Sequence, residues 1–203
     1  MARLGRGEWV DAAYAAFQSA GLASVRVESV ARALGSTKGS FYWHFTDRRE
    51  LLLAVLERWE QLETDGVIAE LEGEETPGGR LAVLLLAIAH RTALRTGERT
   101  LYVDAEAVGV ADVVAGVTER RVGFVTALLT ELGIPAAAAR ARAVVIVAAV
   151  LGYQQMTAAP WNAQTDPVAL VETMFQLAVD GAPHAPAAIT AWQRVRTDWT
   201  PEA

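Results

Sequence analysis

Residues 37 to 45 read Thr-Lys-Gly-Ser-Phe-Tyr-Trp-His-Phe and combine side chains that could bind nucleic acid. Phe41 and Phe45 are four residues apart, so on a helix they share one face and can anchor it in a core. The other face offers a cation, a hydroxyl, two aromatic rings with polar tips and an imidazole, from Lys38, Ser40, Tyr42, Trp43 and His44. Such groups bind the phosphates at the rim of a DNA major groove and the base edges on its floor. The plainer interpretation is an aromatic helix buried in an ordinary core.

The segment upstream favours the DNA interpretation, because it supplies a helix that would position this one. Residues 27 to 34 place four apolar side chains on one face of a helix of about two turns, namely Val27, Val30, Ala31 and Leu34. Gly35 follows, where a helix that ends in a left-handed residue favours glycine. Thr37 can then cap the next helix. Two short helices joined by a tight turn with glycine form a helix-turn-helix, whose second helix enters the groove.

Residues 8 to 56 resemble the N-terminal DNA-binding domain of the TetR family of bacterial transcriptional repressors. The positions in register with the family pattern are Gly21, Val30, Ala31, Gly35, Thr37, Lys38, Gly39, Tyr42, His44, Phe45, Arg48 and Leu51. The resemblance implies an N-terminal three-helix helix-turn-helix domain over residues 1–46. It also implies a larger helical ligand-binding and dimerisation domain over residues 47–203.

We therefore predict DNA contacts from the start of the second helix, from the third helix and from the helix after it. The predicted residues are Arg26, Val27, Glu28, Thr37, Lys38, Gly39, Ser40, Tyr42, Trp43, His44 and Arg48. Two positions depart from the family pattern. Arg26 stands where a hydroxyl cap is usual and cannot accept a hydrogen bond, so either Ser24 caps less directly or Arg26 is kept for a phosphate. Ser36 occupies a turn position that is usually apolar.

The charge distribution agrees with this division of the chain. The net charge of −6 is unfavourable for a DNA-binding protein, since phosphate contacts dominate affinity. Residues 1 to 50, however, carry seven basic and five acidic side chains, whereas the remainder carries 11 basic and 19 acidic ones. The excess of acid therefore lies outside the predicted DNA-binding domain.

The rest of the chain reads as helices. Apolar side chains recur with helical period over residues 8–20, 47–72, 80–96, 101–108, 112–132, 135–158, 167–181 and 187–197. Residues 73–79 and 160–167 read as loops. No stretch alternates with period two for long enough to be a strand. With 52% hydrophobic residues and 7 prolines in 203, the sequence predicts an all-α protein.

Two segments in the second half, residues 143–158 and 168–178, are apolar over more than one face. Such a helix has to bury two sides. In the family that the chain resembles, the last two long helices of each subunit form a four-helix bundle in a homodimer, and these segments match that role. The alternative is that both are central helices of one subunit.

The sequence offers no membrane or secretion signal. The N-terminus lacks the apolar segment of a signal peptide. The longest apolar run, Ala143 to Gly152, is far short of the roughly 20 residues that a span needs. We therefore expect a cytoplasmic protein that does not bind a membrane.

Catalytic and metal-binding patterns are also missing from the sequence. There is no cysteine, and the three histidines, His44, His90 and His184, have no metal-ligand spacing. Nucleophile-elbow, phosphate-loop and dinucleotide-binding patterns are absent. We expect no enzyme activity, no metal and no cofactor.

Small-molecule pockets are apolar with a few placed polar groups, and the second domain has residues of that kind. The candidate effector-binding residues are Trp59, His90, Tyr102, Glu106, Phe124, Tyr153, Gln154 and Trp161. Each alone is more often an ordinary core or surface residue. As a set, they lead to the hypothesis of a ligand-responsive repressor that binds a palindromic, double-stranded operator as a dimer. The alternative hypothesis is an all-α small-molecule binding protein without DNA binding.

Overall fold

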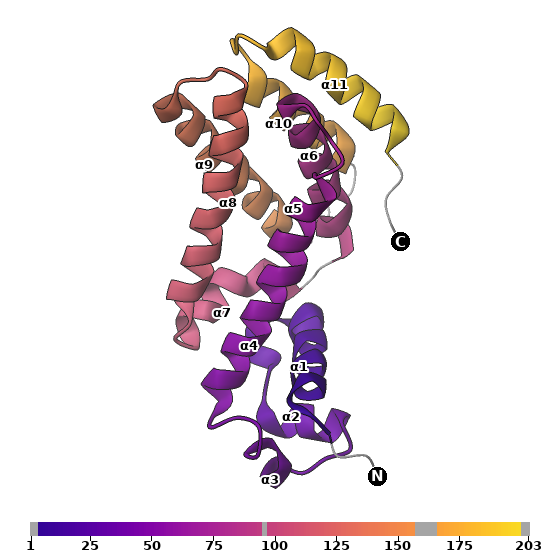
Figure 1. The fold of residues 1–203 in the computed structure, drawn as a ribbon. Coiled ribbons are helices and arrows are strands. Elements are labelled where there is room, and N and C mark those ends of the chain that lie inside the picture. Colours follow the sequence, from indigo (N-terminus) through magenta and orange to yellow (C-terminus); the bar gives the residue numbers. More distant parts are fainter. Residues whose placement is uncertain (1–3, 95–96, 157–165, 200–203) are drawn as a thin grey trace. The chain divides into compact units, whose positions relative to one another are not determined.

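In the computed structural model, residues 4–94, 97–156 and 166–199 are described, and they form helices and no strands (Figure 1). The all-α prediction is therefore confirmed. The chain divides into two compact units. Unit 1 comprises residues 1–64 and 95–117, and unit 2 comprises residues 65–94 and 118–203.

Unit 1 contains the predicted helix-turn-helix. Its elements are α1 (Arg6–Ala20), the 3-10 turn η1 (Leu22–Ser24), α2 (Val27–Ala33), α3 (Lys38–Phe41), α4 (Arg48–Glu60), most of the π-helical η2 (Gln61–Asp65), η3 (Gly97–Thr100), α7 (Leu101–Ala107) and the first residues of α8 (Ala111–Glu131). Helix α1 packs against α2 and α4. The core between them holds fully buried aromatic side chains, Trp9, Phe17, Phe41 and Trp59.

Helix α7 and the start of α8 complete this core. Leu101 and Ala105 of α7 are buried with Val110, Val114 and Val117 in the same cluster as the α1 and α4 side chains. The compact units therefore do not coincide with the division at residues 46 and 47. That division, into a DNA-binding part and a ligand-binding and dimerisation part, stays a prediction.

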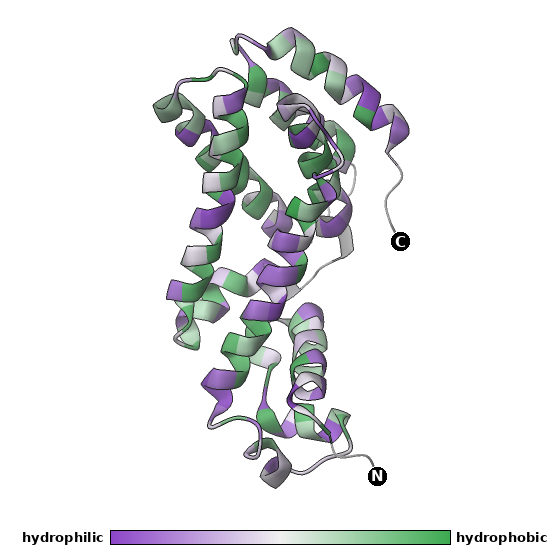
Figure 2. Ribbon diagram, in the orientation of Figure 1, coloured by the Kyte–Doolittle hydropathy of each residue, from purple (hydrophilic) through white to green (hydrophobic). Residues whose placement is uncertain are grey.

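Unit 2 is built around α6 (Pro77–Leu94), which packs against α10 (Pro167–Val179) and α11 (Ala185–Asp198). It also contains α5 (Gly66–Glu70), the rest of α8 and α9 (Ala136–Met156). Phe175 of α10 and Trp192 of α11 meet with their ring centroids 4.8 Å apart inside the core. Figure 2 shows the apolar character of α6, α9 and α10 in green.

Two helices have boundaries that differ from the predicted ones. Helix α6 begins at Pro77, inside the predicted loop, because proline suits a first turn and the Thr76 hydroxyl accepts the Gly79 N–H at 3.1 Å. The segment predicted as one helix over residues 47–72 is α4 and α5 joined by the π-helical η2. The loop predicted over residues 160–167 lies mostly outside the described residues.

Helix α9 is the one element of the described ranges whose length and composition would suffice to cross a membrane, over Ala136–Gln155. Only 17% of its most apolar window is buried. The run from Ala143 to Gly152 that looked too short is thus part of a longer apolar helix, which leaves an uncovered apolar surface.

Candidate nucleic-acid interface

The turn between α2 and α3 is held by backbone hydrogen bonds. The Gly35 N–H donates to the Arg32 carbonyl at 3.1 Å, and the Ser36 N–H donates to the Ala31 carbonyl at 2.8 Å. Gly35 has φ of +60°, a left-handed conformation that glycine adopts at little cost. The predicted glycine turn is confirmed, and it sets the direction in which the chain enters α3.

Helix α3 is shorter than the sequence suggested, and its cap is the predicted one. The Thr37 hydroxyl accepts the Ser40 N–H at 3.2 Å. The helix proper ends at Phe41, after which the His44 and Phe45 N–H groups both donate to the Phe41 carbonyl, at 2.9 and 3.1 Å. The chain therefore keeps a helical course through residue 45 although the regular helix spans a single turn.

The inward side of this segment is anchored as predicted. Phe41 and Phe45 are buried and stack with centroids 5.3 Å apart and planes at 17°. Trp9 of α1 meets Phe41 edge-on at 5.5 Å. These contacts fix the rotation of α3 and hence decide which of its side chains face solvent.

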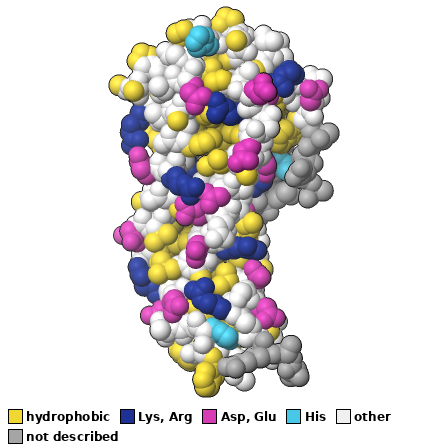
Figure 3. All heavy atoms as spheres, in the orientation of Figure 1, with side chains coloured by type: hydrophobic (Ala, Val, Ile, Leu, Met, Phe, Trp, Pro, Cys, Tyr) yellow, Lys and Arg dark blue, Asp and Glu magenta, His cyan; other side chains and the backbone are white. Residues whose placement is uncertain are grey.

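The outward side carries the two aromatic rings with polar tips. Trp43 is 77% exposed and Tyr42 is 57% exposed. Lys38 and Gly39 are exposed as well, while Ser40 and His44 are half-buried. Figure 3 shows hydrophobic side chains at the surface beside α3. The interpretation of these rings as core residues is therefore wrong, because the core is filled by Phe41 and Phe45.

The first residues of α2 differ in what they can offer to DNA. Arg26 is the exposed N-cap residue, and its side chain makes no capping bond. Ser24 does not replace it, since its hydroxyl donates to the carbonyls of Ala16 and Gly21 at 2.9 and 2.7 Å. The Val27 side chain is only 7% exposed. It was predicted as a DNA contact but lies in the core, because it belongs to the apolar face of α2.

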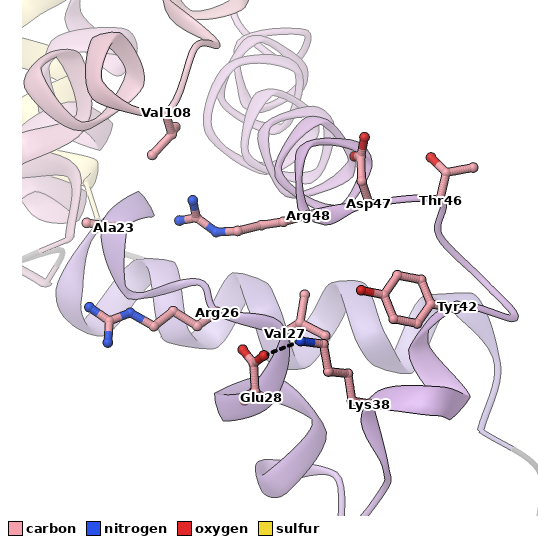
Figure 4. Close-up of a pocket in the computed structure, with 10 residues that line it drawn as sticks. All are labelled: Ala23, Arg26, Val27, Glu28, Lys38, Tyr42, Thr46, Asp47, Arg48 and Val108. Carbon is pink, nitrogen blue, oxygen red and sulfur yellow. Dashed lines mark hydrogen bonds and ion pairs between the residues drawn. The ribbon is translucent and has the colours of Figure 1, made fainter.

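A hollow of about 530 Å³ opens between η1, α2, α3 and the start of α4 (Figure 4). Six of the side chains around it are charged or aromatic with a polar tip, namely Arg26, Glu28, Lys38, Tyr42, Asp47 and Arg48. The hollow thus collects three cations of the predicted DNA-binding set on one surface.

Lys38 and Glu28 form an ion pair across this hollow, drawn as a dashed line in Figure 4. The Lys38 ammonium donates to Glu28 Oε1 at 2.6 Å, and more than half of each side chain is exposed. The hydrogen bond from Lys38 lowers the pKa of the Glu28 carboxyl, and the same bond raises the pKa of the Lys38 ammonium. Both groups are therefore charged at neutral pH.

Arg48, predicted as a phosphate contact, is engaged inside unit 1. Its Nε donates to the Val25 carbonyl at 2.7 Å, and its Nη2 donates to the Leu22 carbonyl at 3.2 Å. Leu22 is the first residue of η1, and Val25 is the residue that caps its C-terminal end. The guanidinium therefore ties the start of α4 to the chain that leads into α2.

The start of α4 carries a variant of the capping box. The Asp47 carboxylate accepts the Glu50 N–H at 2.8 Å. Glu50 Oε2 accepts the Thr46 N–H at 2.7 Å and the Thr46 hydroxyl at 2.9 Å. These bonds, the one from the backbone first, lower the pKa of Glu50. The reciprocal bond thus reaches one residue further back than in a standard capping box.

Sequence reasoning missed the contact of η3 and α7 with the helix-turn-helix. Asp104 Oδ2 accepts the Ala23 N–H and the Thr100 hydroxyl, both at 3.1 Å. A Cβ on Gly97 would lie 1.8 Å from the Phe17 carbonyl oxygen, so η3 lies directly against α1. Asp104 reads in the sequence as half of a solvated acidic pair with Glu106, and no local pattern connects it with Ala23.

The candidate effector-binding residues are divided between the two units. In unit 1, Trp59 is buried, Tyr102 is half-buried and Glu106 is exposed. In unit 2, the four half-buried candidates are His90, Phe124, Tyr153 and Gln154. Trp161 lies outside the described residues. No group of three or more His, Asp or Glu side chains in the described part of the chain could hold a metal ion.

Comparisons with known proteins match the helix-turn-helix region. Residues 10–55 match the model of the bacterial regulatory proteins of the tetR family. The chain is 36% identical over 84 residues to the HTH-type transcriptional regulator AcrR of Shigella flexneri, covering 40% of this chain and 37% of AcrR. It is 31% identical over 97 residues to the regulator TtgR of Pseudomonas putida, covering 47% and 46%. These alignments span less than half of each relative.

Solved structures extend the likeness in fold. A TetR-like transcriptional regulator from Rhodococcus sp. RHA1 aligns with a TM-score of 0.67 at 20% identity, over 88% of this chain and 98% of that one. The transcriptional regulator FadR of Bacillus subtilis, in complex with stearoyl-CoA, aligns with a TM-score of 0.61 at 17% identity, over 87% and 99%. At these identities the likeness concerns the fold alone. The match over residues 10–55 and the geometry of α2 and α3 identify this region as the N-terminal helix-turn-helix domain of the tetR family of bacterial regulatory proteins, and the chain as a whole has a TetR-like fold.

Proposed function

We propose that the chain is a transcriptional repressor that binds a palindromic operator as a homodimer, with a small-molecule effector that changes its affinity for DNA. The observation that carries the DNA-binding part is the exposure of Tyr42 and Trp43 on a segment whose opposite side is anchored by Phe41 and Phe45. Aromatic rings that are exposed to water are energetically unfavourable. Two of them beside a cation therefore indicate a binding surface.

In the proposed complex, α3 enters the major groove and its side chains contact base edges and phosphates. The contacting residues are Lys38, Gly39, Ser40, Tyr42, Trp43 and His44, together with Thr37 at the helix start. Arg26 and Glu28 stand at the start of α2, where the phosphate backbone would pass. Arg48 would also contact a phosphate, through the N–H groups that do not donate to the Val25 and Leu22 carbonyls.

The proposed homodimer supplies two such helices. One reading helix covers only half of a site, and two-fold dimers place their reading helices about 34–36 Å apart, one helical turn of DNA. Support comes from the apolar side chains that α9 and α10 leave exposed, Val145 at 65% and Leu177 at 67%. Helices buried at the centre of a single subunit would not expose such side chains, so the dimer is favoured over that alternative.

Effector control would act through a change in the spacing of the two reading helices. A ligand shifts such an equilibrium only if it binds one conformation more tightly than the other. We place the effector site among His90, Phe124, Tyr153 and Gln154 of unit 2, which are half-buried beside apolar helices. FadR of Bacillus subtilis, which shares this fold, is solved in complex with stearoyl-CoA, a molecule that joins a long apolar acyl chain to a charged group, and this supports a ligand with a large apolar part here. A DNA-binding regulator of this kind would act in the cytoplasm.

A gel shift with the DNA upstream of the protein's own reading frame tests the proposal against its alternative, a binding protein that no longer recognises DNA. We expect a retarded complex at nanomolar protein that a scrambled duplex of equal length does not compete away. Ligands found by native mass spectrometry or thermal shift should then change the retarded fraction. Ligand binding without any retarded complex would favour the alternative.

A further inference from the structure

The Lys38–Glu28 pair places a carboxylate where a DNA phosphate would bind. Lys38 is the first residue of α3 and the only lysine of the chain. Its ammonium lies 2.6 Å from Glu28 Oε1, on the solvent-exposed side of the helix-turn-helix. A carboxylate and a phosphate oxygen are equivalent partners for an ammonium, because both are anionic acceptors at the same distance.

The other two cations of the hollow, Arg48 and Arg26, are placed differently from Lys38. Arg48, the cation across the hollow, already donates two N–H groups to the Val25 and Leu22 carbonyls. Arg26 lies in the same hollow and points away from the pair in Figure 4. Lys38 is therefore the cation of this hollow that stands on α3 itself, and Glu28 neutralises it.

We propose that Glu28 competes with DNA phosphate for Lys38, so that the pair stays closed on random DNA and opens on the operator. This inference rests on the proposed function. It changes the role of Glu28 from a contact with DNA to an internal competitor that decides when Lys38 contacts phosphate.

The state of the pair on each duplex follows from the relative strengths of the interactions. Binding to random DNA comes almost entirely from phosphate contacts, so a cation that is already neutralised adds little to it. An operator complex adds base contacts, each of which outweighs an exposed ion pair. Those contacts draw α3 into the groove and make the exchange of carboxylate for phosphate or base favourable. On random DNA the carboxylate therefore withholds one phosphate contact, whereas the operator complex has to break the ion pair. The pair weakens binding to both duplexes, and the operator complex releases one more counterion per protomer than the complex with random DNA.

The test compares Glu28→Gln, Lys38→Gln and the double variant with the wild-type protein. Each is titrated against the upstream duplex and a scrambled duplex over a range of salt concentrations. Glu57→Gln is the matched control, because Glu57 is an exposed carboxylate of the same unit, nine residues along α4 from Arg48. Glu28→Ala serves as a second removal of the charge if the glutamine variant melts at a lower temperature.

Glu28→Gln should tighten binding to the scrambled duplex by roughly two- to five-fold per protomer, the range expected for an exposed ion pair. Its salt slope should steepen by about 0.9 per protomer, one additional neutralised phosphate. The gain on the upstream duplex should be at least as large, because the wild-type pair has to break in that complex. The salt slope on the upstream duplex should not change, because Lys38 already contacts DNA there. In the Lys38→Gln background, removing Glu28 should do no more than Glu57→Gln does.

Three results would overturn the inference. Equal effects of Glu28→Gln and Glu57→Gln would mean that Glu28 acts only through net charge. A selective loss of upstream binding in Glu28→Gln would mean that Glu28 reads a base directly. The absence of DNA binding by the wild-type protein would overturn the proposed function together with this inference, whereas the first two results leave the proposed function intact.

Discussion

Tyr42 and Trp43 are the residues on which the interpretation of α3 depends. Both are exposed, while the core contacts of the segment are made by Phe41 and Phe45. Tyr42→Ala and Trp43→Ala should each weaken upstream DNA binding ten-fold or more, because a discriminating base contact is worth about 1–3 kcal/mol. The melting temperature should hardly change for Trp43→Ala, whose side chain is mostly exposed, since such changes cost under about 0.5 kcal/mol. It should fall modestly for Tyr42→Ala, because the Tyr42 ring meets the buried Phe41 edge-on with centroids 5.2 Å apart.

Fluorescence anisotropy with a labelled upstream duplex measures these affinities. Val103→Ala is a suitable control, because Val103 is a 74% exposed apolar residue of the same unit, on α7. Normal DNA binding by both aromatic variants would show that the reading surface has been placed on the wrong residues.

Arg48 illustrates how structure changes a residue-level expectation. The sequence suggested a phosphate contact, yet the guanidinium holds two backbone carbonyls of the chain before α2. Arg48→Lys keeps the charge but cannot reproduce this two-pronged geometry. It should lower the stability of the protein by about 1–3 kcal/mol, the cost of unsatisfied partners of a charged group.

Chemical denaturation measures that loss, with Arg49→Lys as the control. Arg49 is exposed and donates one long bond, 3.4 Å, to the Gly109 carbonyl, so its replacement should be nearly neutral. Unchanged stability of Arg48→Lys would return Arg48 to the role of a phosphate contact.

At the scale of elements, η3 and α7 belong with the DNA-binding helices. The Asp104 carboxylate accepts the Ala23 N–H, and η3 lies against the C-terminal turn of α1. Gly97→Ala should therefore disrupt unit 1, because its Cβ would lie 1.8 Å from the Phe17 carbonyl oxygen and backbone cannot give way by that much.

Gly116→Ala, in the same unit, should stabilise the protein instead of disrupting it. Gly116 lies within α8 and a Cβ there meets nothing within 4 Å. Alanine should stabilise that helix by about 0.5–1 kcal/mol. Thermal melts of the two variants, with hydrogen exchange of the Ala23 amide, report on the contact. Equal melting temperatures for Gly97→Ala and Gly116→Ala would show that η3 does not lie against α1.

The elements themselves could be predicted from local signals to a large extent. Thr37 caps the helix that it was expected to cap, and Gly35 follows α2 in the left-handed conformation. Periodicity placed the helices because it depends on residues three and four apart. The π-helical turn over residues 61–65 has no such signature, and neither does the bond between Ala23 and Asp104, which joins segments 81 residues apart.

Part of the candidate site could also be predicted from the sequence. The outward side chains of α3 follow from the spacing of Phe41 and Phe45, so their exposure could be foreseen. The burial of Val27 could be foreseen as well, because Val27 lies on the apolar face of α2. The internal role of Arg48 could not, because it depends on how η1 and α4 pack. The Lys38–Glu28 pair depends on the angle between α2 and α3, which the turn sets.

At the scale of the whole molecule, the proposed dimer predicts a specific weakness on α9. Val145 is 65% exposed, whereas Val147 of the same helix packs partly against the core. Val145→Glu should therefore produce a folded monomer, because it places a charge in the subunit contact without disturbing the core. Its DNA affinity should fall sharply, since each half-site then binds alone.

Analytical ultracentrifugation gives the oligomeric state, with Val103→Glu as the control for an added charge on an exposed apolar residue of unit 1. A Val145→Glu protein that remains dimeric would move the contact away from this face of α9. A wild-type monomer that binds its operator at full affinity would contradict the dimer itself.

The most direct test of the central proposal, that unit 1 binds DNA in a sequence-dependent way, is the salt dependence of affinity for two duplexes. Anisotropy titrations with the upstream duplex and its scrambled counterpart, between about 50 and 200 mM salt, give both affinities and both slopes. We predict a steep fall with salt for both and a preference of at least about a thousand-fold for the upstream duplex. Equal affinities for the two duplexes, or affinities that do not change with salt, would contradict the assignment of this protein as an operator-binding repressor.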